Sequence, residues 1–89
     1  MPASGPVRPV VTAAGPLRRR LDAAEAALAR ESAALAEIEA ALGDPALYIR
    51  GADQIASLNE RRSRLLDRVA RAEAAWLEAA EAYEGASSD

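Results

Sequence analysis

The sequence predicts an all-α fold: a two-helix antiparallel coiled-coil hairpin with a flexible N-terminal tail. Three observations predict it. Alanine occupies 24 of the 89 positions, and the chain has no Phe, His or Cys. This composition is typical of long helices, because alanine loses no side-chain entropy in a helix and a strand gains little from it. Two stretches carry a heptad pattern of apolar residues, and glycine and proline separate them.

The first helix is expected at residues 17–42, after the tail. Residues 1–16 contain four prolines and two glycines, which favour a flexible or extended segment. From Leu17, the residues expected to face the partner helix recur at alternating steps of four and three, which is the heptad period. We call this row of facing residues the seam. Gly43 suits the end of the helix, because glycine accepts the left-handed C-cap geometry. The expected seam is Leu17, Leu21, Ala24, Leu28, Glu31, Leu35, Ile38 and Leu42.

A connector at residues 43–51 is expected to join this helix to a second one at residues 52–84. Gly43-Asp44-Pro45 is a turn signal. A short connector makes sequential helices antiparallel neighbours, and residues 85–89 are expected to fray into solvent. The second seam is Ile55, Leu58, Arg62, Leu65, Val69, Ala72, Trp76, Ala79 and Tyr83.

The length of the connector predicts the register of the two helices. With a connector at 43–51, the numbers of facing residues add up to about 94. A sum of 93 sets every a position opposite a d position, as antiparallel seams prefer, and places Leu35 opposite Leu58. The same register places Glu31 opposite Arg62, and these are the only charged residues on the two seams. A buried ion pair adds little net stability, but loss of one partner costs several kcal/mol. We therefore expect the pair Glu31–Arg62 to fix the register.

Composition argues against an enzyme. Without Cys or His there is no usual zinc site, no thiol nucleophile and no imidazole base. The acids on the outermost helical positions form a solvated stripe and not a carboxylate pair. We expect no catalytic site, metal, cofactor or small-molecule substrate. No apolar run approaches the roughly 20 residues of a membrane helix, so no membrane contact is expected and a cytoplasmic location follows by default.

Four arginines share one face of the second helix, at steps of three, four and three: Arg61, Arg64, Arg68 and Arg71. They span roughly 15 Å, enough for a few phosphates. Arg64 and Arg71 each follow an acid by four residues, so local ion pairs on a solvated face are the alternative. Arg61 and Arg68 have no such acid and face alanines of the first helix. They either lie over alanine with their charged ends in water or bind a phosphate backbone.

A second basic cluster and the aromatic residues are further candidates. Three arginines lie near the start of the first helix: Arg18, Arg19 and Arg20. Local pairing, such as Arg18 with Glu73, is one explanation, and a position beside the path of a nucleic acid is the other. Trp76 and Tyr83, both at seam spacing, are expected in the core. Leu47, Tyr48 and Ile49 are expected to cap the hairpin end, although an exposed Tyr48 would instead stack on a base.

The connector resembles the hairpin turn in the C-terminal domain of ABC-F ATPases, in the stretch Leu42-Gly43-Asp44-Pro45-Ala46-Leu47-Tyr48. Trp76, followed by Leu77-Glu78, resembles another mark of that domain. The resemblance covers about residues 17–84. It implies that Trp76 packs near the base and that four residues form the turn: Asp44, Pro45, Leu47 and Tyr48.

Proteins of this family have two tandem ATP-binding cassettes and act at the ribosome, and some carry a C-terminal arm that binds DNA, notably branched DNA. This chain has no Gly-x-x-x-x-Gly-Lys-Ser/Thr loop, so ATP chemistry would belong to the parent protein. It also has no Lys, although the family's linker and arm are often Lys-rich. The resemblance implies an arm excised from a longer protein, with the tail as the linker to the cassettes.

The expected function is a coiled-coil arm of an ABC-F-type ATPase that contacts DNA, including branched DNA, or ribosomal RNA. The arginine face would bind without sequence readout, and the parent cassettes would be partners in cis. The alternative is a protein-interaction or spacer arm that docks on those cassettes or self-associates through small residues such as Ala26, Ala33 and Ala40. The chain is expected to be a monomer or a weak dimer. A tRNA-contacting arm of a synthetase is a third option, against which Trp76 and the turn argue.

Overall fold

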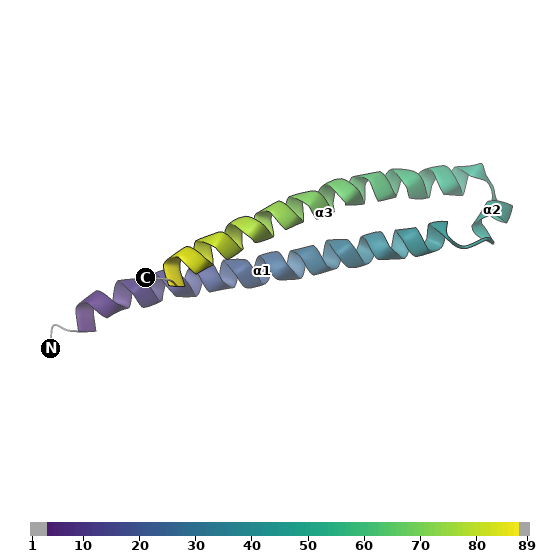
Figure 1. Ribbon diagram of the computed structural model, residues 1–89. Helices are drawn as coiled ribbons and strands as arrows, with labels where there is room; N and C mark the ends of the chain where they lie inside the picture. Colours follow the sequence, from purple (N-terminus) through teal and green to yellow (C-terminus); the bar gives the residue numbers. More distant parts are fainter. Residues whose placement is uncertain (1–3, 88–89) are drawn as a thin grey trace.

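The structure, a computed structural model, describes residues 4–87, without the side chains of residues 4–14 and Arg50. Its elements are α1 (Ser4–Leu42), α2 (Leu47–Arg50) and α3 (Ala52–Ser87). Helices α1 and α3 run antiparallel side by side, and α2 lies at the end where they are joined (Figure 1). The rod measures 75 × 15 × 15 Å. The predicted all-α hairpin is confirmed.

The first helix begins at Ser4 and not at Leu17, so most of the predicted tail at residues 1–16 is helical. The prolines predict that the helix starts only after residue 16. Pro6, however, lies in the first turn, where a backbone N–H has no helical partner anyway. Pro16 is interior and removes one hydrogen bond, which weakens a helix without excluding it. Figure 1 shows these first turns extending past the end of α3. Residues 1–3 lie outside the described residues.

The second long helix begins at Ala52, as predicted, but ends at Ser87 and not at residue 84. The Ser87 hydroxyl donates a hydrogen bond of 2.8 Å to the carbonyl oxygen of Tyr83, one turn earlier. This bond satisfies a carbonyl that has no backbone partner at a helix end. Of the residues expected to fray, only 88–89 lie outside the described part of the chain.

The connector is an ordered turn followed by the short helix α2. The Asp44 Oδ1 accepts the N–H of Ala46 at 3.0 Å, and the Tyr48 hydroxyl donates to the Leu42 carbonyl at 3.0 Å. Leu47 is only 6% exposed. Gly43 does not take the expected left-handed geometry: among the described residues, Gly51 has the positive φ, at 122°, where a side chain would be strained.

The predicted register is wrong by one heptad. Three side-chain contacts across α1 and α3 define the actual one: Arg62 with Glu39, Trp76 with Glu25, and Arg68 with Glu31. Their residue numbers add up to 101, 101 and 99, where the prediction was 93. A shift of seven residues keeps every seam position on the seam, so the heptad pattern alone does not distinguish the two registers.

The expected pair Glu31–Arg62 does not form. Arg62 instead bonds Glu39 at 3.1 Å, and the two side chains are 40% and 48% exposed. Glu31 bonds Arg68 at 2.9 Å. The described residues contain no buried charged side chain, so no buried ion pair fixes the register.

The short helix α2 accounts for the shifted register. Helix α3 extends past the end of α1 by more than one turn, and α2 packs against this overhang. Leu47 is the buried anchor of that contact. The predicted register assumes that residues 43–51 form a symmetric loop. Because α2 packs mainly against α3, the chain instead folds back at a different residue.

The core is a narrow seam between the long helices. Among the described residues, Ala79 is the most deeply buried, at 1% exposure, and the observed register places it opposite the buried Leu21. Trp76 and Tyr83 are half-buried, so the expectation that they lie in the core holds only in part. The buried side chains of the described residues are Leu21, Ile38, Leu47, Leu65 and Ala79.

Candidate nucleic-acid interface

Three of the four predicted arginines line one hollow between the helices. Arg61, Arg64 and Arg68 border it from α3, at steps of three and four that keep them on one side of the helix. Ala34 and Glu31 border it from α1, and the volume is about 260 Å³. Because alanine has only a methyl group, the space beside the arginines stays open. Arg71 does not line this hollow.

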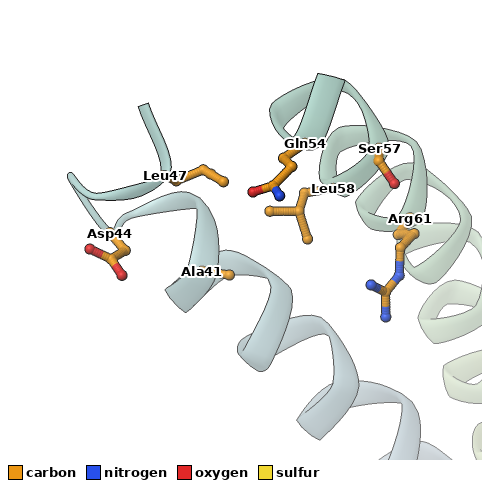
Figure 2. A pocket seen from close by; sticks show the side chains of 7 residues that line it. All are labelled: Ala41, Asp44, Leu47, Gln54, Ser57, Leu58 and Arg61. Atoms are coloured by element: carbon orange, nitrogen blue, oxygen red, sulfur yellow. The ribbon is translucent and has the colours of Figure 1, made fainter. Parts of the chain in front are cut away.

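A second hollow adjoins the first toward the hairpin end, and Arg61 borders both. Its volume is about 370 Å³. Figure 2 shows the side chains of Leu47, Gln54 and Leu58 directed into the space between the two helices, and the Asp44 carboxylate on the far side of the turn from Arg61. The lining residues are Ala41, Asp44, Leu47, Gln54, Ser57, Leu58 and Arg61. We call the two adjoining hollows the arginine groove.

The arginines of the groove differ in their ion pairs. Arg68 was expected to lack an acidic partner, but its Nε donates to the Glu31 Oε2 at 2.9 Å. Arg61 was expected to lack one too, and within the described residues it makes no ion pair or hydrogen bond. Arg64 and Arg71, for which pairs with Glu60 and Asp67 were the alternative, make none either in this part of the chain. The unpaired arginines are therefore available to a ligand.

The N-terminal arginines lie at the other end of the rod. Arg18 bonds Asp22 at 3.1 Å, and not Glu73, and its guanidinium lies 5.5 Å from the centre of the Tyr83 ring. Arg19 and Arg20 are exposed. Tyr83 is separated from Arg61 by roughly 30 Å of helix. The structure thus does not bring the two predicted basic clusters together.

The aromatic residue of the turn is exposed. Tyr48 is 61% exposed although its hydroxyl is bonded, and the neighbouring Ile49 is 87% exposed. The prediction that both cap the hairpin end is therefore wrong, and Leu47 alone of the three is buried. The four residues assigned to the turn by resemblance, Asp44, Pro45, Leu47 and Tyr48, do lie in the turn or in α2.

Two further residues border the groove, Gln54 and Ser57, which were not predicted from the sequence. Their spacing was a usable signal, since both precede Arg61 on the same face of α3. Neither carries a charge, so neither shows in the pattern of basic residues that predicts phosphate contacts.

The described residues hold no group of three acidic, His or Cys side chains able to bind a metal ion. In the same part of the chain, none of the helices is long and apolar enough to cross a membrane. Comparisons with protein-family models, with curated proteins and with solved structures find no match to this chain.

Proposed function

We propose that this chain is a nucleic-acid-contacting arm that holds a phosphate backbone in the arginine groove. One observation carries the proposal: three arginines line one hollow, and within the described residues two of them, Arg61 and Arg64, have no acidic partner. Arginine binds phosphate through a planar fork of N–H donors. DNA, including branched DNA, and ribosomal RNA share this backbone.

The acidic balance of the chain restricts where such contact can occur. The net charge is -3, so nucleic acid is not attracted to the molecule as a whole. Binding therefore depends on the local surplus of positive charge beside the groove, and it is expected to weaken steeply with salt.

The proposed parent protein is an ABC-F-type ATPase, with its cassettes as partners in cis. The resemblance lies in the turn, and the turn residues have defined structural roles here. Asp44 accepts the Ala46 N–H, Leu47 is buried, and Tyr48 bonds Leu42. These roles give a physical reason for that combination of residues, which supports the proposal.

The test compares two double variants by fluorescence anisotropy with labelled single-stranded, duplex and branched DNA and with RNA. Arg61→Gln with Arg64→Gln removes the two unpaired arginines of the groove. Arg19→Gln with Arg20→Gln removes the same charge at the other end of the rod. The groove variant is expected to bind more weakly and to lower the slope of log K against log salt by about 0.7–0.9 for each phosphate that it no longer neutralises.

Equal binding by the groove variant and the original chain at low salt would contradict the proposal. So would an equal loss in both variants, because that result would reflect total charge and not the groove. Helix content measured by circular dichroism checks that both variants remain folded.

Self-association is the second candidate, favoured by exposed apolar side chains. Leu66 and Leu77 are 42% and 52% exposed on α3, and Ala26, Ala33 and Ala40 are exposed on α1. A four-helix dimer would bury such residues. Sedimentation over a range of concentrations discriminates, since a monomer at every concentration excludes the dimer.

A further inference from the structure

We propose that the arginine groove takes one unpaired nucleotide of a nucleic-acid strand, with its phosphate against Arg61 and Arg64 and its base in the hollow at the hairpin end. This rests on the proposed function and goes beyond it. Phosphate contact alone would not distinguish single strands from duplexes. A base in the second hollow makes the arm selective for a strand whose bases are free.

The second hollow has the surface that a base requires. Leu58 and Ala41, both half-buried, give it apolar surface against which the face of a base can pack, and the nearly buried Leu47 borders it too. Leu47 is nearly fully buried in its contact with α3, so this wall is already in place before a ligand binds. A volume of about 370 Å³ is within the usual size range of small-molecule sites.

Polar groups at the edge of the hollow can meet the edge of a base. Gln54 and Ser57 are exposed, and neither makes a side-chain hydrogen bond within the described residues. The Gln54 amide is directed into the hollow (Figure 2). An amide both donates and accepts, so it can bond any of the four bases, and no strong sequence preference is expected.

Arg61 connects the two halves of the site. It borders both hollows, and a guanidinium can bond a phosphate while its face stacks on a base. Gln54, Ser57, Arg61 and Arg64 follow one another at steps of three, four and three along one side of α3. The order along the helix is therefore base contacts first and phosphate contacts next.

Two acids border the site, Glu31 in the first hollow and Asp44 in the second, and each already has a bonding partner. Glu31 is bonded to Arg68, so that pair is locally neutral and Arg61 and Arg64 supply the free positive charge. The Asp44 carboxylate bonds the Ala46 N–H and lies away from Arg61 (Figure 2). A duplex cannot use the hollow, because its bases are paired and stacked, and extruding one costs a few kcal/mol.

The experiment measures binding of the intact chain to three labelled probes: a single-stranded thymidine oligonucleotide, a strand of equal length in which abasic sites replace the bases, and a duplex. The abasic strand keeps every phosphate and has no base. The thymidine strand is expected to bind at least about five-fold more tightly than the abasic strand, which is the lower range for packing one base. It is also expected to bind more tightly than the duplex.

Paired variants locate the effect in the hollow. Gln54→Ala with Ser57→Ala is expected to reduce binding of the thymidine strand and to leave binding of the abasic strand unchanged. The matched control is Asn59→Ala with Ser63→Ala, which removes one amide and one hydroxyl from exposed positions of α3 that do not line either hollow. Alanine favours a helix at all four positions, so both variants are expected to fold.

The outcomes separate this inference from the proposed function. Equal binding of the thymidine and abasic strands overturns the base site and leaves phosphate binding intact. Failure of all three probes to bind at low salt overturns both. A polyglutamate peptide that binds as tightly as the thymidine strand also overturns the base site, since the groove would then recognise acidic chains in general.

Discussion

The two edges of the seam between α1 and α3 differ in how far side chains fill them. Along one, which we call the closed edge, side chains of α3 reach a charged residue of α1: Arg62 to Glu39, Trp76 to Glu25, and Tyr83 to Arg18. Along the other, the open edge, α1 presents Ala34 and Ala41, and the arginine groove lies there. Both edges are built on the same two helices.

The difference teaches that residue size on α1 decides whether the edge is filled. A glutamate or arginine beside the seam is long enough to reach across it and contact α3. Ala34 and Ala41 are too short to do so, and a hollow stays open beside them. Glu31, which borders that hollow, does reach across it to Arg68. The closed edge is suited to holding the helices in register, and the open edge is suited to binding.

Loss of Trp76 is expected to have the largest effect on stability. Trp76→Ala removes the largest side chain of the closed edge and its bond to Glu25, and we expect a loss of about 2–3 kcal/mol in the free energy of unfolding, below the full core value because the residue is only half-buried. Urea unfolding followed by circular dichroism measures this. Leu77→Ala, at the exposed neighbouring position, should change it by about 0.5 kcal/mol or less. Similar losses in both variants would contradict the assignment of Trp76 to the seam.

Charge reversal on the closed edge is expected to have a smaller effect. Glu39→Arg places a positive charge beside Arg62 and should cost about 1 kcal/mol, because the pair is about half exposed and screened by water. Combining Glu39→Arg with Arg62→Glu should restore most of the loss. If the combined variant is no more stable than Glu39→Arg alone, the two residues are not partners and the observed register fails.

Removal of the ion pair between Arg68 and Glu31 on the open edge is expected to change stability least. Arg68 is mostly exposed in its pair with Glu31, so Glu31→Gln should alter the free energy of unfolding by about 0.5 kcal/mol or less. It should instead strengthen oligonucleotide binding several-fold at low salt, since it frees a third arginine of the groove. Glu37→Gln, which removes an equal charge at an exposed position, is the control. An equal gain from both variants would indicate total charge and not the groove.

Much of the fold could be predicted because the heptad pattern is local in sequence. Leu17 to Leu42 and Ile55 to Tyr83 each show it without reference to the rest of the chain. The register could not be predicted in the same way. It depends on how Leu47 packs, and a shift of one heptad satisfies the pattern equally well.

The candidate site was predictable to the extent that it lies on one helix. Arg61, Arg64 and Arg68 share a face of α3 whatever the register is. Whether each of them has a partner depends on what α1 places opposite. The pairing of Arg68 with Glu31 therefore became visible only with the correct register.

The connector also has a consequence for the order of folding. Its hydrogen bonds join residues close in sequence, Ala46 to Asp44 and Tyr48 to Leu42, so it can form with little loss of chain entropy. We expect the two long helices to associate first at this end, because local contacts form before distant ones. Their remaining contacts then form progressively toward Leu21. In stopped-flow measurements, Leu47→Ala should then mainly slow folding, and Leu21→Ala should mainly speed unfolding.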